Sequence, residues 1–351
     1  MAAPSIRYFC CCTNSSKVYF FPKNTTVCRY YSNKIEKPKD VIQPPGKVTR
    51  YFVDKIKSLI QSSEKTASNK FPKAFNVYHT LKTGTSDFFS DTKVYFRVLF
   101  ELWGGKKVGQ FSHSELVIYS QLRKDIWRLT PLLIFTGLIP MGASILPIAY
   151  MFPRYLLSHH FWTRKQKEEF YNQDLKKQLA HCPDILKFFN SYSKHIEDKN
   201  LQERVRHMVQ EIKMKQFQNG EKILEIQPLF NGKPYNLDKL SLAYTRHLAK
   251  CLDLSVRSSK LKHDSLIFLN IDRAMRREGL LTLKDEEIER ACYARGVNPM
   301  GLNREEKLKY LRQWVDVSHK IDESSVSLLL HLPIFLAYTH PANRKLLKHK
   351  S

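Results

Sequence analysis

The residues best suited to chemistry in this sequence are two adjacent histidines, His159 and His160. Neighbouring side chains on an α-helix point about 100° apart, so the two imidazoles need a third group to share an ion. The run Gly104–Lys107 lacks the first glycine and the final Ser or Thr of a phosphate-binding loop. None of the seven cysteines lies in a C-x-x-C motif. The sequence therefore predicts no catalytic residue, metal ligand, cofactor or small-molecule substrate, and we expect a protein that is not an enzyme.

An uncharged stretch, Leu129–Phe152, divides the chain. As a helix it would be about 36 Å long, enough to cross a hydrocarbon core of roughly 30 Å. Aromatic residues of the kind that prefer the membrane interface flank it, namely Trp127, Tyr150, Phe161 and Trp162. A buried soluble helix is the alternative. We expect one transmembrane helix, with its interfacial segments, within residues 112–162.

Two prolines, Pro140 and Pro147, lie inside this stretch and each removes a backbone hydrogen bond. In lipid the freed carbonyls need partners, so the helix is expected to kink there. The kink could be a hinge or an ion-lining element, or simply be tolerated, and the sequence leaves both open. Charge does not orient the stretch, because three basic residues precede it and four follow it: Arg123, Lys124 and Arg128, against Arg154, Arg164, Lys165 and Lys167.

The chain is strongly basic, with 58 Lys and Arg against 33 Asp and Glu and a net charge of +25. Such a charge favours acidic partners, namely nucleic acid, anionic lipid or a ribosome. No acidic residue occurs before Glu36, whereas Ser, Thr and basic residues are frequent there. This composition is typical of a mitochondrial transit peptide. We expect residues 1–31 to be a presequence cleaved after Tyr31.

Turn and capping signals predict that the rest of the chain is helical. The segments Ser112–Glu115 and Thr163–Gln166 have the form of capping boxes. Acidic residues 285–287 suit the first turn of a helix that ends at Gly296, and a second helix begins at Asn303. No segment alternates with period two, so no strands are expected. The expected regions beside the presequence and the transmembrane region are a basic N-terminal helical region (32–111), a helical domain (163–340) and a basic tail (341–351).

Within the last third, ACYARGVNPMGL, LKYLRQWVDV and SLLLHLPIFL resemble the signature of the LETM-domain family, the leucine-zipper/EF-hand transmembrane proteins of the mitochondrial inner membrane. The segment LTPLLIFTGLIPMGASILPIAYMFPRYL is similar to the Pro-containing membrane segment of that family. The resemblance covers about residues 115–340. It is strongest to the short branch, which lacks the coiled coil and the EF-hand.

This resemblance implies an all-α fold, in which one transmembrane helix precedes a multi-helix, 14-3-3-like domain that binds mitochondrial ribosomes from the matrix. It also implies a role in mitochondrial structure and respiratory-chain biogenesis, with the bilayer and other inner-membrane proteins, or further copies of the chain, as partners. The alternative is a part in potassium or calcium exchange for protons. Longer members carry a glutamate where this chain has Ala143, so the obvious charge carrier for exchange is missing.

Four arginines near the signature are candidates for contacts with ribosomal RNA phosphate or with an acidic ribosomal protein. They are Arg276, Arg277, Arg295 and Arg312. A solvated helix face is the plainer interpretation for each one. A third hypothesis treats the helix–turn–helix pair as a module that binds DNA.

Overall fold

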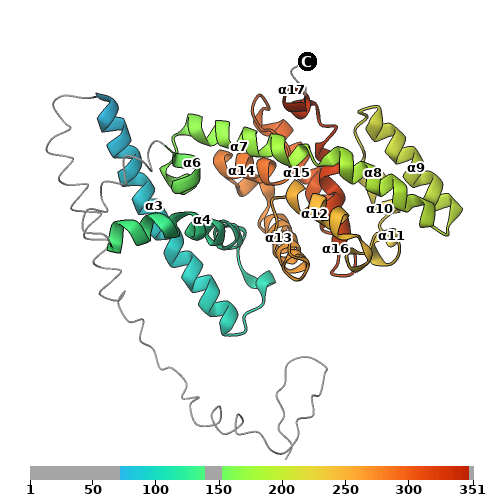
Figure 1. Ribbon diagram of the computed structural model, residues 1–351, viewed down its shortest axis with the longest axis horizontal. Coiled ribbons are helices and arrows are strands. Elements are labelled where there is room, and N and C mark those ends of the chain that lie inside the picture. The colour runs from blue at the N-terminus through green and yellow to red at the C-terminus, as the bar shows by residue number, and fades with distance from the viewer. Residues whose placement is uncertain (1–71, 139–151, 348–351) are drawn as a thin grey trace, which may run out of the picture. The chain divides into compact units, whose positions relative to one another are not determined.

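The computed structural model describes residues 72–138 and 152–347, and every regular element among them is a helix (Figure 1). The expected all-α fold is therefore confirmed for this part of the chain. The first two long helices are α3 (Pro72–Trp103) and α4 (His113–Leu138). The remaining α-helices are α6 (Pro153–Leu156), α7 (Arg164–Leu179), α8 (Cys182–Tyr192), α9 (Lys199–Lys213), α10 (Gly220–Glu225), α11 (Pro228–Asn231), α12 (Leu242–Cys251), α13 (Ser258–Glu278), α14 (Asp285–Ala294), α15 (Arg304–Ser318), α16 (Val326–Leu332) and α17 (Arg344–Leu347).

The capping signals in the sequence mark true helix starts. The Ser112 amide donates to the Glu115 carboxylate over 2.9 Å, and the Glu115 amide donates back to the Ser112 hydroxyl. Thr163 and Gln166 form the same reciprocal pair at the start of α7. Asn303 does so with Glu306 at the start of α15. Each box satisfies two amides that the first helical turn leaves without partners.

The apolar run near the C-terminus forms the centre of the main core. All of α16 is buried, and the chain continues past Pro333 as the π-helical turn η7 (Pro333–Ala337). The Tyr338 amide donates to the Pro333 carbonyl over 2.8 Å. Within this core the His331 ring bonds the Ser327 carbonyl and the Tyr244 hydroxyl, both over 2.7 Å. The core therefore contains a fully hydrogen-bonded histidine.

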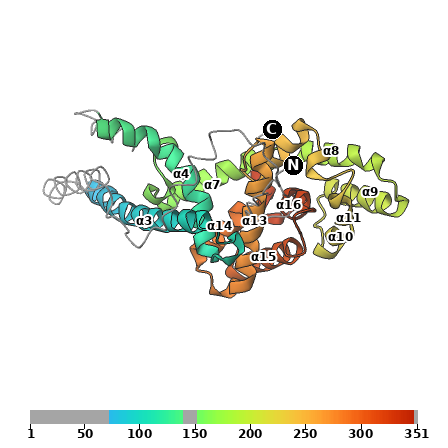
Figure 2. The ribbon, with the colours of Figure 1, turned by 90° about the horizontal axis from the view of Figure 1, so that it is seen from below.

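Helices α3 and α4 pack onto the C-terminal helices through α13, which also contacts α15 and α16 (Figure 2). A second cluster of buried side chains joins Phe111 and Leu116 to Ile267 and Ile271. At its edge Arg123 pairs with Asp264 over 2.7 Å. The described residues before and after the uncharged stretch are thus packed together, although the sequence suggested separate regions.

The predicted transmembrane helix is described only in part. Leu129–Leu138 form the end of α4, whereas Pro140, Pro147 and Tyr150 lie outside the described residues. Within residues 72–138 and 152–347, no helix combines the length and the apolar character that a membrane crossing requires. The transmembrane helix and its kink therefore stay predictions, as does the presequence.

The two flanks of the uncharged stretch lie against each other. Leu129 packs with Leu157 and Trp162 in one buried cluster. Asp125, one turn before Leu129, bonds the His159 ring over 2.7 Å. In a straight helix Leu129 and Leu157 would be about 42 Å apart. Leu129 and Leu157 are therefore not the two ends of one straight helix.

The aromatic residues expected at a membrane interface have different environments. Trp162 is only 5% exposed, and its indole nitrogen donates to the Pro153 carbonyl over 3.0 Å. It is a core residue, and its assignment to the interface was wrong because the Leu129 cluster covers it. Phe161 is partly buried against Phe88. Trp127 is 75% exposed and remains a candidate for the interface.

The helical domain does not end at residue 340. Asn343 is buried, and its side-chain amide donates to the carbonyls of Gly296 and Ala337, both over 2.8 Å. Leu346 and Leu347 pack against the main core. The expected basic tail from residue 341 is therefore part of the fold as far as Leu347.

Candidate functional site

The first candidate residue, Arg295, lies inside the protein. It is 2% exposed and bonds Asp272, which is fully buried, through Nε over 3.0 Å and through Nη2. Trp314 donates its indole N–H to the other oxygen of Asp272 over 2.9 Å. The arginine at the end of α14 and the tryptophan of α15 thus bind one carboxylate on α13. Arg295 cannot reach a ribosome from this position, and its expected place on the surface was wrong.

The turn after Arg295 is also built for packing. Gly296 has a φ of +87°, and a Cβ there would lie 3.0 Å from the Cβ of Ala337. The Tyr310 hydroxyl donates to the Arg295 carbonyl over 2.5 Å. A glycine is needed at this turn because the backbone is left-handed and the turn touches the buried π-helical segment. Arg295 and Gly296 of this turn therefore connect the end of α14 to α15 and to the π-helical segment η7.

The other three arginines are exposed. Arg276 pairs with Asp316 over 3.3 Å. Arg277 donates to the carbonyls of Gly109 and Phe111 over 2.7 and 2.6 Å, so it holds the start of α4. Arg312 has no ion-pair partner among the described residues. Arg276 and Arg312 are therefore better placed to meet an external anion than Arg277.

A basic strip follows the outer face of α15. Lys309 and Arg312 are exposed and three residues apart, and Asp316 lies four residues further on the same face. The ion pair with Asp316 places the Arg276 side chain of α13 beside this face of α15. We call Arg276, Lys309 and Arg312 the α15 strip. The one ion pair described for the α15 strip, Arg276–Asp316, is largely exposed to solvent, so it binds the Arg276 side chain only weakly.

A pocket of about 450 Å³ lies among α4, α7, α13 and α14. Its polar lining includes His113, Asp125, His159, Glu287 and Arg290. Burial, helped by the charge of Arg295, lowers the pKa of His113 to about 4, so this imidazole is neutral at physiological pH. Arg290 forms no ion pair with a carboxylate in the described part of the chain. The pocket therefore presents both neutral and charged groups.

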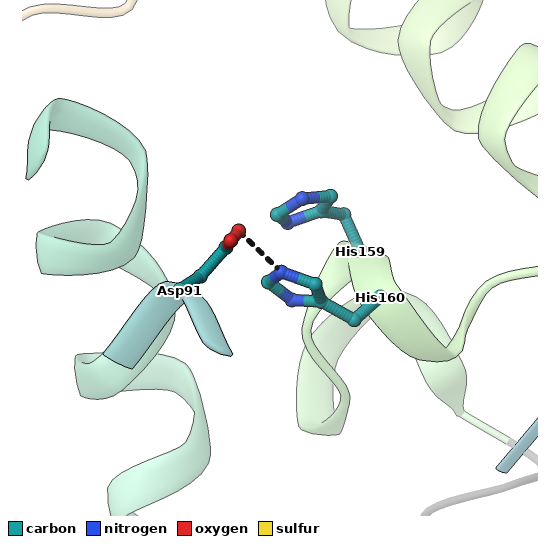
Figure 3. A group of neighbouring side chains, drawn as sticks. All are labelled: Asp91, His159 and His160. Carbon is teal, nitrogen blue, oxygen red and sulfur yellow. Dashed lines mark hydrogen bonds and ion pairs between the residues drawn. The ribbon is translucent and has the colours of Figure 1, made fainter. Parts of the chain in front are cut away.

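One edge of the pocket contains a cluster that the sequence did not reveal. His159 and His160 lie on the short 3₁₀ helix η3 (His159–Phe161), and both rings point towards Asp91 of α3 (Figure 3). One donor atom of each residue lies within 4.8 Å of the other two. Asp91 is 69 positions from His160, so local spacing gave no sign of this third group.

Comparison with known proteins identifies the family. The LETM1-like, RBD family matches residues 111–335. LETM1 domain-containing protein 1 of Xenopus tropicalis is 26% identical over 310 residues, which cover 86% of each chain. The Homo sapiens protein of the same name is 25% identical over 306 residues, 84% of each chain. LETM1 domain-containing protein mdm28, mitochondrial, of Schizosaccharomyces pombe is 25% identical over 329 residues, 90% of this chain and 66% of that protein. The chain belongs to the LETM1-like, RBD family.

Proposed function

We propose that the protein is a mitochondrial inner-membrane anchor that binds the mitochondrial ribosome with its C-terminal helical domain in the matrix. The observation that carries the ribosome contact is the exposed α15 strip, in a chain with a net charge of +25. The location rests on the transit-peptide composition and on a relative whose name includes the word mitochondrial. The uncharged residues 129–152 supply the attachment to the membrane. In this way the protein supports respiratory-chain biogenesis.

Two of the four candidate arginines are bound to backbone carbonyls or to a buried carboxylate within the protein. Arg295 serves the fold, and Arg277 is bound to two backbone carbonyls. Arg276 and Arg312 remain, with Lys309 beside them on α15. A ribosome offers mostly phosphate to an approaching cation, and each phosphate that is neutralised releases counterions. Binding through the α15 strip should therefore weaken steeply as salt rises.

The test is co-sedimentation of the full chain, in mild detergent, with purified mitochondrial ribosomes over a series of salt concentrations. The variant R276A/R312A removes two cations of the strip. If both contact phosphate, the slope of log affinity against log salt should fall by about two units. Affinity should fall at every salt concentration below physiological strength.

The matched control is R206A/K213A, which removes two exposed cations from α9. Its salt slope should equal that of the unchanged chain, because α9 is not part of the strip. Equal slopes for all three proteins would reject the α15 strip as the contact. If R276A/R312A and R206A/K213A lost the same amount of ribosome affinity, net charge alone would explain the loss, and the α15 strip would again be rejected as the contact.

Attachment to the membrane is tested separately. The protein should stay in the pellet when mitochondria are extracted with alkaline carbonate. Release into the supernatant would refute an anchor made by residues 129–152.

A further inference from the structure

The cluster at η3 gathers the donor types that first-row transition metals prefer. His160 Nε2 lies 2.9 Å from Asp91 Oδ2. The rings of His159 and His160 have centroids only 3.9 Å apart, because the short 3₁₀ helix turns adjacent side chains to the same side (Figure 3). Two imidazoles and one carboxylate suit zinc and its neighbours in the first transition row.

We propose that Asp91, His159 and His160 bind one divalent transition-metal ion, and that Zn²⁺ fits this donor set best. The ligands are Nε2 of both histidines and the carboxylate of Asp91. In a tetrahedral zinc site the donor atoms are about 3.3 Å apart. The donors here lie within 4.8 Å of one another, so closing around the ion needs shifts of at most about 1.5 Å.

Neighbouring groups already orient both rings. Asp125 bonds His159 Nδ1 over 2.7 Å, which leaves Nε2 for the ion. Such a carboxylate–histidine–metal arrangement fixes the ring and increases its basicity. Asp125 is itself buried, so it is held in place. This partner explains how His159 can be presented to an ion within the protein.

His160 can exchange its hydrogen bond for a metal bond without a net loss of protons. With the ion absent, its Nε2–H donates to Asp91, and its Nδ1 accepts from the Ser158 hydroxyl over 2.5 Å. With the ion bound, the proton resides on Nδ1 and is donated to the Ser158 oxygen. The Ser158 hydroxyl then donates to Asp125, whose carboxylate oxygen lies 3.4 Å away. The four side chains can therefore adapt together.

The site would leave one coordination position for an outside ligand. Asp91 and His159 both line the pocket of about 450 Å³, so water or a small anion from the pocket can take the fourth position. Three protein ligands with one open position are typical of zinc sites that interact with solutes. The ion would also join α3 to η3, which lie on opposite sides of residues 129–152 in the sequence. Occupancy should therefore stabilise this part of the fold.

The experiment uses the untagged full chain in detergent, stripped with a chelator and then titrated with zinc chloride by calorimetry. Metal content after dialysis gives the stoichiometry, and Co²⁺ absorption reports the geometry. We expect one equivalent of zinc, tetrahedral cobalt bands and a higher midpoint of thermal unfolding with zinc. In D91N and H160Q the affinity should fall by more than the roughly 10–100-fold that losing a group hydrogen-bonded to a ligand costs.

The matched control is H247Q. His247 and His181 form another histidine pair, with Nδ1 atoms 3.2 Å apart and Asp184 nearby, outside the pocket. H247Q should bind zinc like the unchanged chain. Zinc affinity that is equal in D91N, H160Q and the unchanged chain would overturn the proposal, and so would an equal loss in H247Q.

Folding is monitored by circular dichroism in the presence of chelator. The amide oxygen introduced in D91N can still accept a hydrogen bond from His160, so this variant should fold. If H160Q does not fold, D91N alone decides the outcome. Zinc bound by folded D91N as tightly as by the unchanged chain would show that the cluster is only a hydrogen-bond network.

Discussion

Replacing Arg295 separates a structural role from a role in binding ribosomes. In R295M the buried Asp272 loses both guanidinium bonds and, among the described residues, keeps the Trp314 indole as its hydrogen-bond partner. The Ala291 carbonyl also loses its 2.8 Å bond from Nη1, and the Phe268 ring loses the cation that lies 5.3 Å from its centre. The substitution therefore leaves a charge buried without its counterion.

Removing one partner of a buried ion pair costs about 3–5 kcal/mol. Because the pair here is at most 2% exposed, we expect R295M to lose about 4 kcal/mol of unfolding free energy. With a urea dependence of roughly 2 kcal/mol per molar, the midpoint should fall by about 2 M. R295K keeps the charge but not the two-pronged geometry, so it should also be destabilised. The double variant R295M/D272N strands no charge and should cost less than the two single changes added together.

The assay is urea unfolding of the full chain in detergent, followed by helical circular dichroism. R312M is the control, since its exposed side chain should change stability by less than about 0.5 kcal/mol. Ribosome sedimentation of folded R295M should show an unchanged salt slope. A loss below about 1 kcal/mol together with a slope lowered by one unit would refute the buried role and restore Arg295 as a phosphate contact.

Three further predictions test packing and titration. In an ordinary helix, Gly84→Ala would stabilise the protein by about 1 kcal/mol. Here the new Cβ would lie 2.5 Å from the His160 carbonyl oxygen, so the midpoint of thermal unfolding should fall. A higher midpoint would contradict the close approach of α3 to η3. Burial lowers the pKa of His331 to about 4. The neutral imidazole therefore contributes its full stabilisation above pH ~6.5, and roughly 3 kcal/mol of unfolding free energy is lost as the pH falls towards 4. In urea titrations at different pH values, H331Q should lack this part of the pH dependence. Burial also raises the pKa of the Cys182 and Cys292 thiols. Maleimide labelling of the native full chain, read by mass spectrometry, should modify at most four of the seven cysteines, and the three that stay unmodified should be Cys182, Cys251 and Cys292.

The parts of the fold that depend on neighbouring residues could be predicted from the sequence. Asn303 and Ser112 start helices because each cap involves residues only three positions apart. The apolar run that begins at Val326 has too few residues to cross a membrane, so its length and composition together are consistent with the buried segment that the structure shows. Such features need no knowledge of the tertiary arrangement.

Long-range pairs could not be predicted. Asp272 binds Arg295, 23 positions away, and nothing in the local spacing indicates this pair. Asp91 and His160 meet over 69 positions. A charged residue within an apolar run, such as Asp272 in LIFLNIDRAM, was the one available sign that a buried partner existed. Only the tertiary contact between Arg295 and α13 identifies that partner.

The joining of Leu129 to Leu157 changes how the charges beside the uncharged stretch should be counted. With the two flanks in separate compartments, three basic residues oppose four and the orientation is undecided. Asp125 and His159 are in contact, so if residues 129–152 attach the protein to a membrane, the basic residues of both flanks would lie on the same side and their seven positive charges would add together. Lys and Arg close to the ends of a membrane segment influence which side of the membrane those ends occupy. If the proposed anchor keeps its helical domain in the matrix, both flanks would lie there, and protease added outside the inner membrane should reach neither.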